Sequence, residues 1–156
     1  MLDKSEEILL LLRKITRSID LYSKQLEKRY GLTGPQMVVL KIIVQQKSIY
    51  GNTLAQTANL SPATITSILD RLEKKGYSKR ERTDKDKRKV VITATQQANE
   101  LFADSPAILQ EKFTENFESL KNWEQSLLIS SLERIADMMS AENVDASPYL
   151  TTSSNI

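Results

Sequence analysis

The chain has 156 residues and a mass of 17.7 kDa, which favours a single domain large enough to bury its own core. It contains no cysteine and no histidine, which excludes disulfides, thiol nucleophiles, histidine-based triads and metal sites that need either ligand. Hydrophobic residues make up 40% and charged residues 27%, so a wholly disordered chain is not expected, and the presence of only four glycines and four prolines favours long helices.

The amino-terminal residues argue against export and membrane insertion. Acidic residues precede the first apolar run, whereas a secretory signal begins with basic residues. That run, at 8–12, is far shorter than the roughly 20 residues of a membrane span. We therefore expect a cytoplasmic protein with no membrane contact.

Residues 5–30 are predicted to form one long helix that ends at Gly31. Its apolar residues alternate spacings of four and three, the heptad pattern of a helix that packs along another helix. Further leucines beside this seam widen the apolar surface, which suggests a second partner for the helix.

The next stretch carries start signals for two helices. A capping box and a first-turn proline open a largely buried helix over 33–46. Asn52 or Thr53 is expected to cap a short helix over 54–58.

A third helix is predicted to start at Ser61, an N-cap followed by proline, and to end near Lys75, with Gly76 just beyond it. Its expected buried stripe has helical spacing and consists of Ile65, Ile68, Leu69 and Leu72. The opposite face is small and polar near the start and basic toward the end.

Tyr77 to Arg82 and Lys89 to Thr93 are predicted to form a hairpin with a polar, highly charged loop. Segment 71–89 carries ten Lys or Arg and four Asp or Glu, a net charge of +6, which leaves −4 for the rest of the chain. Clustered positive charge on a near-neutral protein favours a polyanionic partner, most often nucleic acid. On charge alone, a solvated charged face explains the segment equally well.

Another helix is predicted from Thr95, with a kink or break near Asp104 and Ser105 because Pro106 follows. A last helix is expected to begin with Asn122 as its cap and to repeat the alternating apolar seam. Residues 142–156 are predicted to be a disordered tail.

The two terminal seams are predicted to form a dimer interface, because they are too wide for one small domain to cover. Packing within one subunit is the less favoured alternative. The interface residues are Ile8, Leu12, Ile15, Ile19, Leu128, Leu132, Ile135 and Met139.

Two short helices joined by a tight turn and followed by a charged hairpin predict a winged helix-turn-helix. A recognition helix needs an apolar stripe for docking and short polar side chains near its start to enter a major groove. The predicted fold class is all-α dominated with a small β-hairpin wing. The expected organisation is a helical dimerisation region at 1–30 and 95–141, a winged helix-turn-helix at 31–94 and a tail at 142–156.

An ordered set of motifs over about residues 5–140 resembles the MarR family of bacterial transcription regulators. The motifs are Leu32-Thr33-x-x-Gln36, Leu54-Ala55, Ser61-x-Ala63-Thr64-x-Thr66-x-x-x-Asp70-Arg71-Leu72-Glu73-Lys74-Lys75-Gly76, and Arg82-Thr83-Asp84-Lys85-Asp86-Lys87-Arg88. The resemblance implies a homodimer on a near-palindromic double-stranded DNA operator, with recognition helices in successive major grooves. We expect it to be a repressor.

The resemblance also implies which residues contact DNA. Arg88 would enter the minor groove while Asp86 orients it, and Lys85 and Lys87 would contact phosphates. The full predicted DNA-binding set is Ser61, Ala63, Thr64, Thr66, Ser67, Arg71, Lys85, Asp86, Lys87 and Arg88.

This chain departs from the family pattern in two places. The family continues from the wing with Leu-Thr-x-x-Gly, whereas Ala94-Thr95-Gln96-Gln97-Ala98 stands here, which puts the packing of the wing strand on the next helix in doubt. Lys87 stands where the family often has arginine, which keeps the charge but not the bidentate fork.

Members of the family tend to bind small effectors between the dimerising helices and the DNA-binding lobe. Tyr22, Tyr30 and Phe102 are candidates to line such a pocket, although aromatic residues are more often core. The absence of cysteine and histidine excludes the cysteine peroxide sensors and His/Cys zinc sensors of this family, so an organic effector or none remains.

The segments around Ile15 to Leu21 and Gly31 to Gln36 are similar to regulators of osmolyte synthesis and uptake in marine bacteria.

Two alternatives to this interpretation are open. Asp86 and Arg88 could form a surface ion pair of little energetic value. The winged helix could instead bind an acidic protein partner. An enzyme is not expected, because no convergent set of carboxylates and lysines is visible. Neither a cofactor nor a metal is expected, since Asp84 and Asp86 lack a third ligand nearby.

Overall fold

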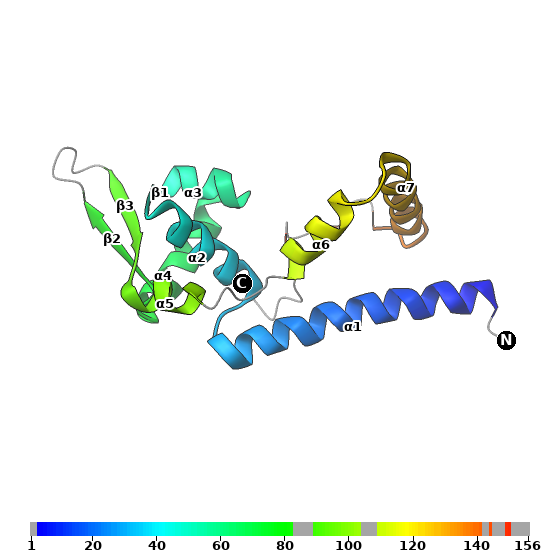
Figure 1. Ribbon diagram of the computed structural model, residues 1–156, viewed down its shortest axis with the longest axis horizontal. Helices are drawn as coiled ribbons and strands as arrows, with labels where there is room; N and C mark the ends of the chain where they lie inside the picture. Colours follow the sequence, from blue (N-terminus) through cyan, green and yellow to red (C-terminus); the bar gives the residue numbers. More distant parts are fainter. Residues whose placement is uncertain (1–2, 83–88, 104–108, 142–143, 145–148, 151–156) are drawn as a thin grey trace. The chain divides into compact units, whose positions relative to one another are not determined.

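The computed structural model describes residues 3–82, 89–103, 109–141, 144 and 149–150. The chain divides into two compact units, which are residues 1–106 with 148–156 and residues 107–147. The first unit holds a long helix and a helical core with a small sheet, and the second holds two helices (Figure 1). The fold is therefore helix-dominated with a small antiparallel sheet, as predicted.

Helix α1 (Lys4–Tyr30) covers the predicted span and ends at Gly31, whose φ of 64° is left-handed. Its two buried residues, Ser23 and Leu26, lie in its last two turns. In its first half Leu12 is half-buried, and five apolar residues are 37–53% exposed, which are Ile8, Leu9, Leu10, Leu11 and Ile15. The fully buried residues of α1 thus lie in its carboxyl-terminal part.

The helix-turn-helix core consists of α2 (Gly34–Gln46), α3 (Gly51–Ala58) and α4 (Pro62–Lys74). The predicted capping box opens α2, since the Thr33 N–H donates to Gln36 Oε1 at 3.2 Å. The largest fully buried side chains gather around α2 and are Leu32, Met37, Val39, Leu40, Ile43, Leu54, Leu72 and Ile92. These residues form the hydrophobic core that supports the candidate interface.

The start of α3 differs from the prediction. Residues Ser48–Tyr50 form a short strand, β1, and Tyr50 itself is the N-cap of α3, so neither Asn52 nor Thr53 caps this helix. A strand of three residues is too short to show a recognisable alternation of apolar and polar residues in the sequence. Its pairing partner, Thr93 opposite Ser48, lies far away in the sequence.

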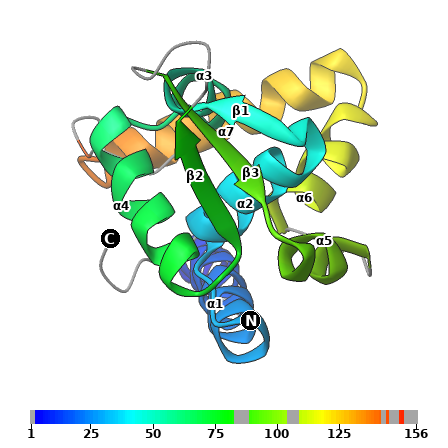
Figure 2. The same cartoon turned by 90° about the vertical axis from the view of Figure 1, so that its left-hand side faces the viewer.

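The wing is the hairpin of β2 (Ser78–Arg82) and β3 (Val90–Ala94), within one residue of the predicted strand ends. All three strands are antiparallel in the order β1-β3-β2, with β3 in the middle (Figure 2). Ile92 of β3 is 1% exposed and lies opposite Ile49 on one side and Arg80 on the other. The central strand therefore anchors the wing in the core.

The wing strand packs on the next helix without the leucine and glycine of the resembled family. The Thr95 hydroxyl donates to the Gly76 carbonyl oxygen at 2.7 Å, and the Ala98 N–H donates to the same hydroxyl at 3.3 Å. Ala98 is fully buried. Thr95 thus links the start of α5 to Gly76 after α4, and Ala98 is a buried residue of α5.

Three more helices follow, α5 (Gln96–Ala103), α6 (Leu109–Glu118) and α7 (Asn122–Met138). The predicted break near residues 104 and 105 lies outside the described residues, between α5 and α6. The cap of α7 is one residue earlier than predicted, because Lys121 rather than Asn122 has the extended N-cap backbone and its N–H donates to Glu124 Oε2 at 2.9 Å.

One described residue of the predicted tail contacts the helical core. The Tyr149 hydroxyl donates to the carbonyl oxygen of Ala58 at the end of α3. Burial raises the pKa of this hydroxyl above its usual value near 10.

Among the described helices, none is both long enough and apolar enough to cross a membrane.

We predict that Gly76→Ala lowers the free energy of unfolding by about 1–2 kcal/mol, the usual cost of a left-handed backbone for a residue with a Cβ. Gly76 has a φ of 78°, and an added Cβ would lie 3.3 Å from Gln97 Oε1. Urea unfolding followed by circular dichroism measures the change. Gly51→Ala is the matched control, because its backbone is not left-handed and its Cβ would lie 3.9 Å from Ile92. Equal stability of Gly76→Ala and wild type would contradict the prediction.

Candidate nucleic-acid interface

The start of α4 is held by its own cap. Ser61 Oγ accepts the Thr64 N–H at 3.1 Å and lies 2.8 Å from Thr64 Oγ1, and Pro62 occupies the first helical turn. The cap and the proline fix where the helix begins. The predicted helix start at Ser61 and Pro62 is confirmed.

One face of α4 is buried and the opposite face is free. The predicted stripe is 0–4% exposed and consists of Ile65, Ile68, Leu69 and Leu72. On the outward side Ala63, Thr66 and Arg71 are exposed, and Thr64 and Ser67 are half-buried. The structure therefore places the helical part of the predicted DNA-binding set on one helix, with small side chains toward its start and Arg71 further along.

Hydrogen bonds restrict what three of these hydroxyl side chains can offer to a ligand. The Thr66 hydroxyl donates to the carbonyl oxygen of Pro62 at 2.9 Å. The hydroxyls of Ser61 and Thr64 share a hydrogen bond. Thr66 can therefore present its methyl group and an acceptor lone pair, but not a free O–H.

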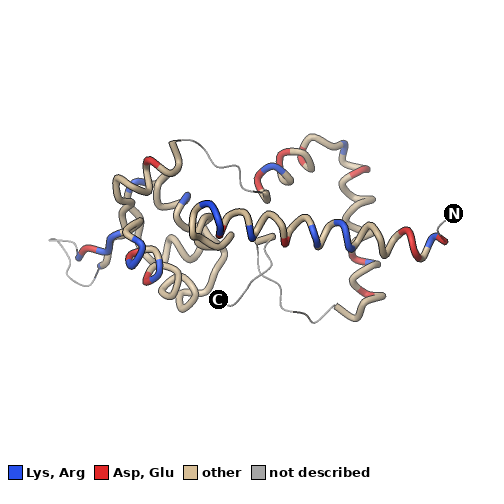
Figure 3. The backbone as a smooth tube through the Cα atoms, turned by 90° about the horizontal axis from the view of Figure 1, so that it is seen from below, with Lys and Arg blue, Asp and Glu red and all other residues tan. Residues whose placement is uncertain are grey.

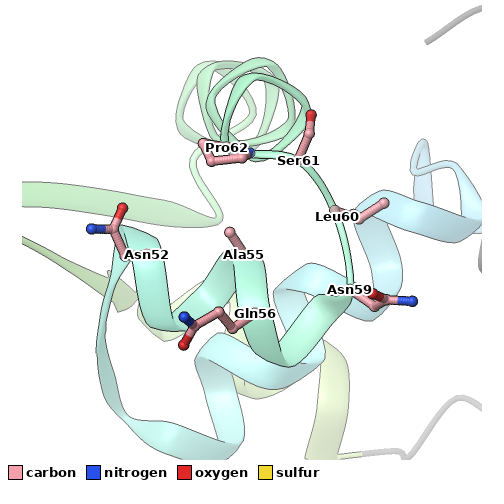
Figure 4. Close-up of a pocket in the computed structure, with 7 residues that line it drawn as sticks. All are labelled: Asn52, Ala55, Gln56, Asn59, Leu60, Ser61 and Pro62. Atoms are coloured by element: carbon pink, nitrogen blue, oxygen red, sulfur yellow. The ribbon is translucent and has the colours of Figure 1, made fainter.

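An open hollow of about 500 Å³ lies between α3 and the start of α4 (Figure 4). Its lining is Asn52, Ala55, Gln56, Asn59, Leu60, Ser61 and Pro62. The amide side chains of Asn52, Gln56 and Asn59 come from α3 and the turn after it. Uncharged donors thus surround the end of α4 that carries the small polar residues. Sequence reasoning missed these amides, because single Asn and Gln residues on a short helix form no motif.

Exposed basic residues lie at the other end of α4 and on the wing. They are Arg71, Lys74, Lys75, Lys79, Arg82 and Lys89. Figure 3 shows lysine and arginine at several places along the first unit, including the part that carries the wing. The predicted wing residues Lys85, Asp86, Lys87 and Arg88 lie outside the described residues.

Acidic residues of α4 are paired with the wing. Arg80 Nη2 on β2 lies 2.5 Å from Asp70 Oδ1 and 2.5 Å from Glu73 Oε2 on α4, and Arg80 Nε lies 2.9 Å from Glu73 Oε2. The hydrogen bond to Glu73 and, to a lesser extent, the hydrogen bond to Asp70 raise the pKa of the Arg80 guanidinium above its usual value. Both carboxylates on this side of α4 thus have a cation beside them.

The candidate dimerisation residues differ in exposure. Leu12, Ile19 and Ile135 are half-buried in this chain, whereas the others are 38–64% exposed and are Ile8, Ile15, Leu128, Leu132 and Met139. Sequence reasoning omitted further exposed apolar residues of α7, which are Trp123, Leu127, Ile129 and Met138. The unbroken apolar run at 127–129 was the signal for two of these.

The three candidate effector residues are all half-buried. Tyr22 and Tyr30 lie on α1 and Phe102 lies on α5. Arg29 lies over the Tyr30 ring, 5.2 Å from its centroid. The two hollows beside α4, of about 500 and 230 Å³, are lined by other residues.

Comparison with known proteins gives a family match over the helix-turn-helix and wing. Residues 21–105 match the model of the family described as transcriptional regulator SarA/Rot. SarZ of Staphylococcus haemolyticus, an HTH-type transcriptional regulator, is 31% identical over 108 residues, which cover 69% of this chain and 72% of SarZ. The HTH-type regulator YfiV of Bacillus subtilis is 30% identical over 99 residues, which cover 64% of this chain and 62% of YfiV, less than two thirds of that relative.

Solved structures with the same fold are also found. A MepR-like protein in complex with pseudoligands has a TM-score of 0.60 and 24% identity, covering 85% of this chain and 94% of that protein. AbfR in its reduced form, bound to DNA, has a TM-score of 0.53 and 24% identity, covering 87% of this chain and 94% of AbfR. At this identity the likeness concerns the fold.

Proposed function

This chain belongs to the SarA/Rot family of transcriptional regulators, and we propose that it is a homodimeric repressor that binds a near-palindromic DNA operator. The observation that carries the proposal is the free face of α4, which has small side chains at its start and a cation further along, while the opposite stripe is buried. A helix with this division of faces can dock on its own domain and enter a major groove.

We expect three kinds of contact with DNA. Ala63, Thr64, Thr66 and Ser67 meet base edges, and Arg71 meets a base or phosphate further along the groove. The amides around the hollow between α3 and α4 donate to backbone phosphates, because they flank the start of the recognition helix. Arg88 at the wing enters the minor groove with Asp86 beside it. AbfR, a protein of the same fold, is bound to DNA, which supports this use of the fold.

A second copy of the chain is the proposed occupant of the apolar faces of α1 and α7. Apolar faces of this extent on single helices are unusual for a monomer and mark interaction sites. A two-fold dimer presents two recognition helices to half-sites about 10 base pairs apart.

The proposed function includes regulation by a small molecule and a cytoplasmic location. A small organic effector, in a pocket lined by Tyr22, Tyr30 and Phe102, relieves DNA binding. The protein acts in the cytoplasm and, like its relatives among the transcriptional regulators, without catalysing a reaction. The resemblance to regulators of osmolyte genes stays a prediction.

We predict that the purified protein binds the DNA upstream of its own gene tightly and saturably, with two subunits per site, and binds a scrambled duplex of equal length far more weakly. Fluorescence anisotropy at about 150 mM salt, close to physiological ionic strength, measures both. Equal weak binding to both duplexes would contradict operator recognition at this locus. A pull-down that then recovers an acidic protein would favour the protein-interaction alternative.

The salt dependence of DNA binding distinguishes the contribution of Arg88 from those of Lys85 and Lys87. Arg88→Ala is expected to lose roughly 1–3 kcal/mol of operator binding if Arg88 makes a specific contact. Lys85→Ala and Lys87→Ala should instead weaken all sequences alike and reduce the slope of log K against log salt by about one unit each. Unchanged slopes would remove their phosphate role, and unchanged affinity of Arg88→Ala would remove the minor-groove role of the wing.

The dimer interface is testable with one charge on α7. Leu132→Asp is expected to raise the dimer dissociation constant at least about a hundredfold, since an unpaired buried carboxylate costs about 3–5 kcal/mol. Sedimentation equilibrium measures it. Ser130→Asp, which adds the same charge at an exposed polar position of the same helix, is the control. An unchanged dimer in Leu132→Asp would place the interface elsewhere.

A further inference from the structure

The contact between the wing and the recognition helix is polar on the β2 side. Strand β2 (Ser78–Arg82) contains no apolar residue. The Arg80 side chain reaches α4 from the middle of this strand, and its guanidinium contacts two carboxylates one helical turn apart. Lys79, the preceding residue of β2, is exposed. Because side chains of a strand alternate in direction, Lys79 and Arg80 point to opposite faces of the wing.

The geometry of this cluster restrains direction as well as distance. A guanidinium is planar and rigid, and here two of its nitrogens engage Glu73 while one of them also engages Asp70. The Arg80 and Glu73 side chains are 29% and 30% exposed, so both are largely withdrawn from water. A cation held from two points on a helix resists both sliding along that helix and rocking away from it.

The position of the cluster matters for DNA. Asp70 is 58% exposed and lies next to Arg71, on the side of α4 that is proposed to face the groove. Any tilt of β2 relative to α4 would change the spacing between the helix in the major groove and the wing in the minor groove. Both elements must fit one duplex at the same time.

We propose that Arg80 is a positioning residue, whose ion pairs with Asp70 and Glu73 set the angle of the wing to the recognition helix and thereby set the specificity of DNA binding. This inference rests on the DNA-binding function proposed above. Arg80 itself contacts α4 and not the DNA.

If Arg80, Asp70 and Glu73 acted only through their charge, a different effect on DNA binding would be expected. Two variants distinguish this charge effect from a positioning effect. Arg80→Met removes one positive charge, whereas the double variant Asp70→Asn with Glu73→Gln removes two negative charges. If these residues acted only through their charge, the first variant would weaken and the second would strengthen binding to every duplex. If the ion pairs position the wing, both variants lose preference for the operator over the scrambled duplex, each by about tenfold, the equivalent of one base contact.

Anisotropy titrations on both duplexes give that preference. Lys79→Met is the matched control, because it removes the same charge from the same strand without touching Asp70 or Glu73. It is expected to lower affinity for both duplexes and keep the preference. Arg80→Lys, which keeps the charge but cannot form the planar fork, is expected to fall between Arg80→Met and wild type. Opposite shifts of affinity with unchanged preference in Arg80→Met and in the double variant would overturn the proposal.

A second measurement needs no DNA and so separates this proposal from the proposed function. In the free protein, NMR relaxation dispersion should appear at the amides of β2 and β3 in Arg80→Met and in the double variant, and should be absent in wild type and Lys79→Met. Thermal unfolding of each variant verifies that it is folded under these conditions. A wing that stays equally rigid in both variants would overturn the positioning role even if the wild type binds its operator.

Discussion

Four apolar side chains on one face of α4 anchor the recognition helix, and the rest of the candidate interface depends on them. Ile65, Ile68, Leu69 and Leu72 are 0–4% exposed against a core built around α2. Burying them withdraws one stripe of the helix and leaves the opposite stripe in solvent. Because a buried aliphatic side chain contributes about 1.5–3 kcal/mol, this stripe holds the helix without any contact from its outer face. The outer side chains are consequently available to a ligand.

The wing depends on the same core through a different residue. Ile92 of the central strand β3 is buried between neighbours on β1 and β2, and it ties the small sheet to the helical core. The outer strand β2 has no apolar side chain and meets α4 through Arg80. The hairpin is therefore held by hydrophobic packing at its centre and by ion pairs at its edge. Ion pairs depend on direction and are screened by salt, so the stability of this edge is expected to depend on ionic strength.

Outside the core the chain exposes a large amount of apolar surface. The first half of α1 and much of α7 present leucine, isoleucine, methionine and tryptophan to solvent within the single chain. Each helix carries its own apolar face, whatever the placement of the two units. We propose that this surface pairs two chains of a protein from a family of transcriptional regulators, so that two recognition helices reach one duplex.

The sequence by itself determined the spans of the helices, the cap and buried stripe of α4, and the hairpin. It also determined that the chain belongs to a family of winged-helix transcription regulators. Caps, heptads and turn glycines are local signals, because each depends on residues that are close together in the chain. Sequence reasoning misplaced the caps of α3 and α7 and missed β1, whose pairing with β3 joins residues far apart in the chain. The partnership of Arg80 with Asp70 and Glu73 and the hollow lined by Asn52, Gln56 and Asn59 also required the fold. Only the tertiary structure decided these features, because the charges and amides involved are common along any soluble chain. They acquire a role only when separate elements bring them within hydrogen-bond distance or around one hollow.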